Sequence, residues 1–581
     1  MGDAVGTVRV TTPGGRTVLA SFSGYDRRWV PADVIAGATV WAVLVPEALA
    51  YATIAGVSPV VGLYAAPAAL ALYALLGSSR HLVTGPMAAT AALSAAAVGD
   101  VATRGGTDFA SLTTGLALVT GMLGLVAGLV RLGFLASFIS QSVLKGFIIG
   151  LALTIMVGQL PKLFGVEAGE GDFFEKLVEL ITSLGDTHGW TLLLGAASLA
   201  LVVGLRRFAP AVPGSLVAVA AGIAAVALFD LDERGVDIVG PIGAGLPDLG
   251  LPDLGWGDYA SLSGSAVGIL LVGFAEGLGA AKSYAARHHE AIDANRELIA
   301  VGAANLGSGL SSGMVVDGSL SKTAVNVSAG ARSQLSGLVA AALTVVTLLF
   351  LTSLFEDLPE ATLAAVVIAA VIELVDVKAL VRLYRLYTAE LGQIYGVSAR
   401  PDLIAAVAAM VGVLVFDTLP GLFIGIACSV LLIVYRASRP HVAVLGRAAG
   451  QRHWVDVDRH PDARPVPGVV AVRPESGLFY ANADTVHASI LRHLDAATTL
   501  VVLDFESVPV IDVTAAEMLS QLDDELRARG IRLAIARDIG QVRDLLAHAG
   551  DPRLLDHVHP TVDDAVRSLA EPSPAPDPEE P

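Results

Sequence analysis

The 581-residue sequence contains a single cysteine, Cys428, and few charged residues. One cysteine excludes a disulfide or a cysteine metal cluster within one chain. Charged residues make up only 16% of the sequence, against about a quarter in soluble domains. It has no Gly-rich phosphate loop and no basic stripe, which argues against an NTPase and against binding of nucleic acid. What remains is a chain that is 54% hydrophobic with a formal charge of −18.

Apolar runs recur from Val34 to Val434, and many have the length of about 17–25 residues that a helix needs to cross a bilayer. We therefore predict a polytopic α-helical membrane protein with roughly fourteen spans. The spans begin near residues 33, 60, 86, 110, 134, 190 and 214, and a second set begins near residues 263, 294, 319, 334, 360, 402 and 419. The third member of each set is short. This correspondence predicts two repeats of seven spans, inverted in topology because seven is odd.

Two amphipathic segments, 173–184 and 377–391, are predicted to be interfacial helices that lie on the membrane. Basic residues precede the first span (Arg27 and Arg28) and follow the last (Arg436 and Arg439). By the positive-inside rule both termini are expected in the cytoplasm. We predict a multi-pass protein of the cell (inner or plasma) membrane.

The composition changes after Pro440. Residues 451–581 contain 12 Arg and no Lys against 23 Asp and Glu, a net charge of −11. Short β-branched runs at 469–472, 500–503 and 531–535 alternate with helical patterns at 483–494 and 514–528, which predicts a small α/β domain. Thr514 and Glu517 fit a capping box at the second helix. The predicted organisation is a cytoplasmic N-terminal segment (1–28), a transmembrane transport domain (29–440), a linker (441–467), the α/β domain (468–570) and a disordered acidic tail (571–581).

The same polar arrangement occurs once in each half of the apolar region. The first copy has Glu47 in an apolar run, followed roughly forty residues later by Thr84-Gly85-Pro86-Met87. The second has Glu276, followed at a similar distance by Asp317-Gly318-Ser319-Leu320-Ser321-Lys322-Thr323. An acid inside the membrane is costly to place there, so it predicts a functional site. A broken helix that recurs in both halves of a chain points to the binding site of a transporter.

The two breaks suit an anion. A helix N-terminus offers free backbone N–H groups and the positive end of the helix dipole, which together bind anions. Pro86 suits a first helical turn, because its missing N–H would be unsatisfied there anyway. Ser319 and Ser321 add hydroxyl donors, and Lys322 adds a full positive charge. The alternative is that both breaks are loops at the membrane surface.

Glu47 and Glu276 have two possible roles. Burial disfavours the charged form of a carboxylate, so each could carry a proton or pair with a cation. Glu47 could instead simply neutralise Lys322. Tyr51 lies one helical turn beyond Glu47 on the same face, where it could line the pocket or pack in the core. Lys145 is expected to snorkel or pair with a carboxylate. Arg287-His288-His289-Glu290 is expected to be a solvated loop, and no metal site is predicted.

These motifs resemble those of the SulP family of anion transporters, also called solute carrier family twenty-six. The resemblance is carried in the first half by the segments Val45–Ala52, Gly62–Tyr64, Ser78–His81 and Thr84–Pro86. In the second half it is carried by Gly318–Asn326 and Ala329–Arg332. The segment from about Gly468 to Leu569 is similar to a STAS domain, the C-terminal module of that family.

The resemblance implies a seven-plus-seven inverted-repeat fold with core and gate domains, an elevator motion and commonly a homodimer. It implies that the substrate binds between the third and tenth spans, and that the coupling ion, H⁺ or Na⁺, binds near Glu276. With the helix breaks, it gives the following candidates for anion binding: Glu47, Tyr51, Gly85, Pro86, Met87, Ala88, Ser319, Ser321, Lys322 and Thr323. The candidates for the coupling ion are Glu47 and Glu276, and no other cofactor is expected.

Three positions depart from the family pattern. Many members have Gln where this chain has Glu47, and an acid there favours proton coupling. Many have Arg where it has Lys322, which makes a bidentate anion clamp unlikely. In related anti-sigma-factor antagonists a phosphorylated Ser follows the Asp matching Asp512, whereas here Val513 stands there, which places phospho-switching in doubt.

We therefore predict a proton- or sodium-coupled secondary transporter of a small inorganic or organic anion, with sulfate as the first substrate, and no enzymatic activity. Bicarbonate and dicarboxylates such as fumarate or succinate suit the same pocket. The alternatives are an uncoupled exchanger or channel of the same fold, a receptor that senses an anion for the STAS domain, and a nucleobase transporter. Related nucleobase carriers usually lack a STAS domain.

Overall fold

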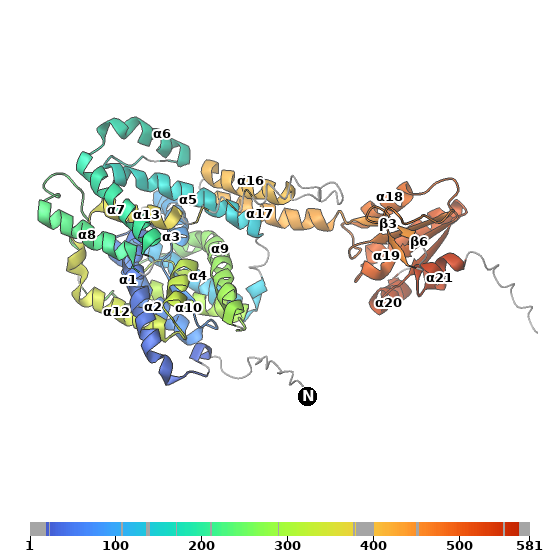
Figure 1. The fold of residues 1–581 in the computed structure, drawn as a ribbon, viewed down its shortest axis with the longest axis horizontal. Coiled ribbons are helices and arrows are strands. Elements are labelled where there is room, and N and C mark those ends of the chain that lie inside the picture. Colours follow the sequence, from blue (N-terminus) through green and yellow to red (C-terminus); the bar gives the residue numbers. More distant parts are fainter. Residues whose placement is uncertain are drawn as a thin grey trace, which may run out of the picture. The chain divides into compact units, whose positions relative to one another are not determined.

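The computed structural model describes residues 19–568 except 23, 106–107, 135–139, 170, 210–211, 244, 289, 373, 376–377, 379–380, 382–399, 417, 449–452 and 550–551. Its elements form two compact units, Met1–Tyr384 with Asp402–Ser429, and Arg385–Pro401 with Val430–Pro581. The first is helical and apolar, and the second is an α/β unit (Figure 1).

The apolar region is built from two successive sets of helices (Figure 1). The first set is α1 (Val30–Ile54), α2 (Pro59–Leu76), α3 (Ala88–Gly105), α4 (Phe109–Leu129), α5 (Gln141–Phe164), α7 (Gly189–Phe208) and α8 (Gly214–Phe229). The second is α9 (Trp256–His288), α10 (Ala294–Leu310), α11 (Leu320–Ser328), α12 (Leu335–Phe350), α13 (Glu360–Ile372), α16 (Arg400–Phe416) and α17 (Thr418–Ala437). The starts lie close to the predicted ones, which confirms the predicted polytopic helical fold.

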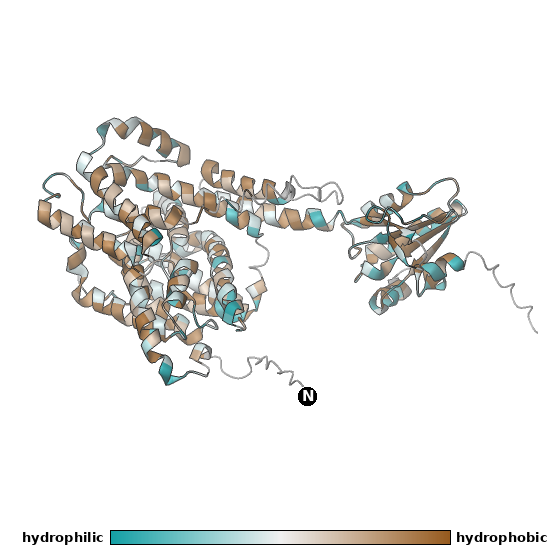
Figure 2. Cartoon of the chain, viewed as in Figure 1, coloured by the Kyte–Doolittle hydropathy of each residue, from teal (hydrophilic) through white to brown (hydrophobic). Residues whose placement is uncertain are grey.

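Among the described residues, seven helices are long and apolar enough to cross a membrane, and five more are shorter apolar helices. The shortest member of the second set, α11, is the tenth span and the counterpart of the broken third span. Figure 2 shows hydrophobic residues along most of these helices. A helix that is apolar on nearly all sides is typical of a membrane span.

Small residues let these helices approach closely, as packing in lipid favours. On α4, a Cβ added to Gly124 would lie 2.9 Å from the Cα of Gly302 on α10. On α2, a Cβ at Gly62 would lie 1.9 Å from the backbone oxygen of Ala48 on α1. This contact fixes α1 next to Glu47, so the glycine of α2 helps to position a candidate site residue.

Two short strands interrupt the helical pattern. Strand β1 (Val83–Gly85) pairs antiparallel with β2 (Asp317–Ser319), and Thr84 lies opposite Gly318. All six residues are buried. Each strand leads into a helix, β1 into α3 and β2 into α11. The breaks are therefore not loops at the surface, because they meet each other inside the fold.

One of the two predicted interfacial helices is described. Helix α6 (Phe173–Ser183) starts with a capping box formed by Asp172 and Glu175. Its apolar residues Phe174, Val178 and Ile181 are exposed, as an amphipathic helix at a membrane surface requires. Most of the other predicted segment, 377–391, lies outside the described residues.

The second unit contains a six-stranded sheet in the order β4-β3-β5-β6-β7-β8. Its strands are β3 (Val442–Arg447), β4 (Trp454–Asp456), β5 (Val469–Pro474), β6 (Leu500–Asp504), β7 (Arg532–Ala536) and β8 (Val558–His559). Strands β5 to β8 are parallel to one another, whereas β3 is antiparallel to both β4 and β5. Helices α18 (Ala483–Arg492), α19 (Val513–Ala528) and α20 (Gly540–Ala549) cover one face, and α21 (Val562–Arg567) covers the other.

Two predictions for this unit need correction. The predicted linker 441–467 contains β3 and β4, so the sheet begins well before residue 468. The predicted capping box of Thr514 and Glu517 is also wrong, because Asp512 is the N-cap of α19 and its side chain accepts from the Ala515 N–H. Asp is a strong N-cap residue, and its extended backbone lets the helix start one residue earlier.

The close contact of α1 and α2 gives a stability prediction. Gly62→Ala should destabilise the protein by about 1–3 kcal/mol, because its methyl group would overlap a backbone oxygen that cannot move without shifting α1. Thermal unfolding in detergent should show a lowered midpoint. Gly158→Ala on α5 is the matched control, because a Cβ there meets nothing within 4 Å. Equal midpoints for the two variants would contradict this account of the packing.

Candidate functional site

The pairing of β1 with β2 brings the two helix breaks together. Thr323 reinforces the pairing, since its hydroxyl accepts a hydrogen bond from the Val83 N–H at 3.0 Å and donates one to the Ser319 carbonyl at 2.5 Å. Asn326 on α11 also donates to the His81 carbonyl just before β1. The N-termini of α3 and α11 therefore start side by side, and the first-turn N–H groups of a helix have no partner within the helix itself.

The first break differs in detail from the prediction. Helix α3 begins at Ala88, and the Ala91 N–H donates to the Met87 carbonyl, so Pro86 precedes the helix rather than standing in its first turn. An extended strand up to Gly85 delays the start of the helix. Pro86 nevertheless faces the site, because its carbonyl oxygen accepts a hydrogen bond from Lys322 Nζ at 3.0 Å. Gly85, Pro86, Met87 and Ala88 are all buried.

The second break places two hydroxyl groups at the start of α11. Ser319 is the N-cap, and its Oγ accepts from the Lys322 N–H at 3.3 Å. The Oγ atoms of Ser319 and Ser321 lie 3.1 Å apart. Ser319 is buried but Ser321 is exposed. This end of α11 is therefore accessible from outside the packed core.

Lys322 is the central charge of the site, with 1% of its surface exposed. Its Nζ atom lies 2.9 Å from Glu47 Oε2, in addition to its hydrogen bond with the Pro86 carbonyl. It also lies 5.0 Å from the centroid of the Tyr51 ring, a cation–π contact. The structure thus contains the ion pair that was one of the two interpretations of Glu47, and Tyr51 contributes its ring to this pair.

The ion pair of Lys322 and Glu47 has a chemical consequence. A lysine this deeply buried must be neutralised, and here Glu47 from α1 supplies the negative charge. An anion that approached Lys322 would compete with Glu47 for the same ammonium group. Protonation of Glu47 would remove that competition, so the arrangement can link a proton to an anion.

Glu276 lies on α9, which packs against β2, and its neighbour Gly277 contacts Gly318. The Glu276 carboxylate is within electrostatic range of Lys322 but forms no ion pair with it in the described part of the chain. The described residues also contain no group of three or more metal-ligating side chains. His288 instead stacks on His81, with ring centroids 4.6 Å apart.

Two residues near the site were missed by the sequence reasoning. Arg206 on α7 interacts electrostatically with both Glu47 and Tyr51, and its guanidinium donates to the Ala369 carbonyl. Arg206 and Arg207 follow an apolar run, and this local pattern carries no sign that Arg206 lies near Glu47. Asp317 was noted as part of the second motif, but its burial beside α9 could not be seen without the fold.

Comparison with known protein families matches two parts of the chain. Residues 31–397 match the sulfate permease family, and residues 460–565 match the STAS domain. The chain belongs to the sulfate permease family. The family match contains both breaks, both acids and Lys322, so the site lies in the part of the chain that defines this permease.

Curated relatives agree with this assignment. A probable sulfate transporter of Mycobacterium tuberculosis is 38% identical over 565 residues, with 96% of this chain and 99% of the relative covered. Probable sulfate transporter 4.2 of Arabidopsis thaliana is 31% identical over 90% of this chain and 78% of its own length.

Solved structures show the same fold. The overall structure of SLC26A9 matches with a TM-score of 0.84 at 20% identity, covering 95% of this chain and 92% of that one. The transmembrane domain of the cyanobacterial bicarbonate transporter BicA matches with a TM-score of 0.59 at 23% identity, covering 68% of this chain and 98% of that one. The permease is therefore a helical membrane protein of the SLC26A9 fold with a C-terminal STAS domain.

The buried ion pair predicts a pattern of stabilities. Lys322→Met should destabilise the permease by about 3–5 kcal/mol, because it leaves the Glu47 carboxylate buried without a partner. Adding Glu47→Gln should recover much of that loss, because no charge is then left unpaired. Unfolding midpoints of the two single variants and the double variant, measured in detergent at neutral pH, test this. Additive losses would show that the two side chains do not interact.

Proposed function

We propose that this permease is a secondary active transporter of small oxyanions, with sulfate as its substrate and protons as its coupling ion. Its curated relatives are named sulfate transporters, which supports this substrate. The observation that carries the proposal is the buried ion pair of Lys322 and Glu47 between the two helix N-termini.

The anion would bind where the starts of α3 and α11 meet. The donors available there are the first-turn N–H groups of α3 and α11 other than that of Lys322, the exposed hydroxyl of Ser321 and the ammonium of Lys322. These donors suit a small oxyanion that accepts several hydrogen bonds at once. Gly85 leaves room beside them, because a Cβ there would come no nearer than 3.6 Å to its closest neighbour, Leu44.

Coupling would follow from competition for Lys322. With Glu47 ionised, the ammonium is neutralised and attracts an anion weakly. When Glu47 takes a proton, Lys322 becomes a free cation in surroundings of low dielectric constant, where its attraction for an anion is strong. Glu276 would act as a second acid, within range of the same ammonium group. A proton and an anion would thus enter the site together.

The strand pair and its helices would move as a body relative to a gate in an elevator cycle. The permease would be a homodimer in the cell membrane, with its N-terminus and STAS domain in the cytoplasm. The basic residues at the ends of the membrane region support this orientation.

Labelled sulfate uptake into proteoliposomes under an inward proton gradient tests the function. Accumulation should depend on the gradient and collapse when a protonophore removes it. If uptake instead survives the protonophore and is lost when sodium is removed, the coupling ion is sodium and not the proton. If folded, inserted protein takes up no sulfate, the substrate is wrong, and bicarbonate and dicarboxylates are the next anions to test.

Glu47→Gln tests the coupling step. The neutral amide mimics protonated Glu47, so net uptake should lose its response to the proton gradient while sulfate-for-sulfate exchange persists. Glu233→Gln is the matched control, since Glu233 is exposed in a turn after α8. Gradient-driven accumulation that survives in Glu47→Gln at the level of the control would show that Glu47 does not couple protons to the anion.

A further inference from the structure

Asp317 is a third carboxylate near the site, and the proposed cycle gives it no role. It is the first residue of β2, opposite Gly85 of β1, and only 2% of its surface is exposed. Asp33 and Glu297 are also buried acids of this unit, but each accepts three or more hydrogen bonds. Asp317 is therefore the exceptional case that needs an explanation.

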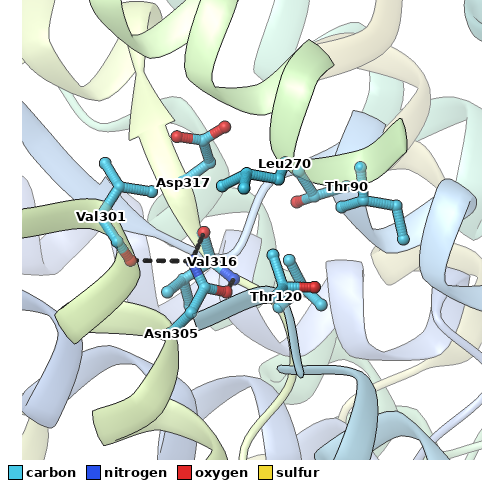
Figure 3. Close-up of a pocket in the computed structure, with 9 residues that line it drawn as sticks. Thr90, Thr120, Leu270, Val301, Asn305, Val316 and Asp317 are labelled. Atoms are coloured by element: carbon cyan, nitrogen blue, oxygen red, sulfur yellow. Dashed lines mark hydrogen bonds between the residues drawn. The ribbon is translucent and has the colours of Figure 1, made fainter. Parts of the chain in front are cut away.

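The Asp317 carboxyl group has few partners. Its Oδ1 accepts from the N–H of the next residue, Gly318, at 2.6 Å, and no other donor reaches the group within the described chain. Figure 3 shows the carboxyl group turned away from Asn305, whose amide is already bonded to the backbone of Val301 and Val316. A buried carboxylate with so few donors is costly in its charged form.

Helix α9 provides space for this carboxyl group but no donor. A Cβ added to Gly273 would lie 1.8 Å from Asp317 Oδ2, and one added to Gly277 would lie 3.0 Å from Oδ1. The two glycines are one helical turn apart on the same face of α9. Because neither has a side chain, they leave a recess that the Asp317 carboxyl group fills. The recess holds the acid in place against α9 without stabilising its charge.

The groups that surround Asp317 on the neighbouring elements are acidic or neutral. From α9 it faces Glu276, with which it interacts electrostatically. On α10 the neutral Asn305 lines the same small cavity, and on β1 Asp317 stands opposite Gly85, which has no side chain. The buried cation of the candidate site, Lys322 of α11, is paired with Glu47. A proton is the smallest cation that could neutralise Asp317 in so confined a recess.

We propose that Asp317 is a further proton-carrying carboxyl group of the transport cycle, in addition to Glu47 and Glu276. It takes one proton from water on one side of the membrane and releases it to water on the other side in the same turnover as the anion. This inference rests on the proposed proton-coupled transport. Its consequence is that the permease carries one proton more per anion than a variant with a neutral residue at position 317.

The proton-to-sulfate ratio tests this directly. In proteoliposomes the membrane potential is clamped at zero and a pH difference of one unit is imposed. The opposing sulfate gradient is then increased until the net flux of sulfate stops, and this gradient is the balancing gradient. Each proton carried per sulfate multiplies the balancing gradient about tenfold. Asp317→Asn should therefore lower the balancing gradient about tenfold, while sulfate-for-sulfate exchange persists. Asp232→Asn, in an exposed turn, is the matched control and should leave the gradient unchanged.

The outcomes separate this inference from the function on which it rests. If the wild-type permease shows no proton-driven uptake, both are wrong. If it is coupled but Asp317→Asn balances the same gradient, then Asp317 keeps its proton throughout, and only this inference is overturned. If Asp317→Asn does not fold, Asp317→Ser carries the same expectation. Failure of both neutral variants to fold would also overturn the inference, because a side chain that is neutral during part of the cycle must tolerate a neutral replacement.

Discussion

The burial of one ammonium group is the constraint on which the site depends. Lys322 has almost no exposed surface, so its charge must be neutralised within the fold. Glu47 from α1, the Pro86 carbonyl before α3 and the Tyr51 ring do so together. Each partner comes from a part of the chain far from α11 in sequence. The ion pair therefore ties the first half of the membrane region to the second.

The strand pair makes that arrangement possible. Two helices that start inside an apolar fold would each leave unsatisfied backbone groups before their first turn. Pairing β1 with β2 satisfies these groups with each other and places both helix starts at one point. Glycines then let the neighbouring helices approach, as Gly277 does against Gly318. The result is a site in which both helix starts and the Lys322–Glu47 ion pair lie together.

The STAS domain is built on a different principle. Its strands alternate between two hydrophobic clusters, one facing α18, α19 and α20 and the other facing α21. At the end of β6, Asp504 is fully buried and accepts from both Arg473 and Arg537. Here a buried carboxylate has the cationic donors that Asp317 lacks. These two buried acids of the chain thus lie in opposite surroundings, one with arginine donors and one against glycines.

The sequence by itself determined the membrane class, the two sets of helices, the α/β unit and the residue types of the site. These follow from hydrophobic runs and from polar residues that are costly in lipid, and both signals are local in the chain. The resemblance of the sequence to the SulP family was carried by segments that contain these same polar residues. Local signals were weaker at element ends, which is why the start of α3 and the N-cap of α19 were placed wrongly and the strands before residue 468 were predicted as a linker.

Only the tertiary structure decided which charges meet. Glu47 and Lys322 are 275 residues apart in the sequence, and nothing local to either fixes a distance of 2.9 Å between their side chains. The same holds for Arg206 near Glu47 and for Asp317 against the glycines of α9. Such contacts depend on strand register and helix packing, which arise from the whole fold. The sequence thus supplied the charged groups, and the fold decided which of them were paired.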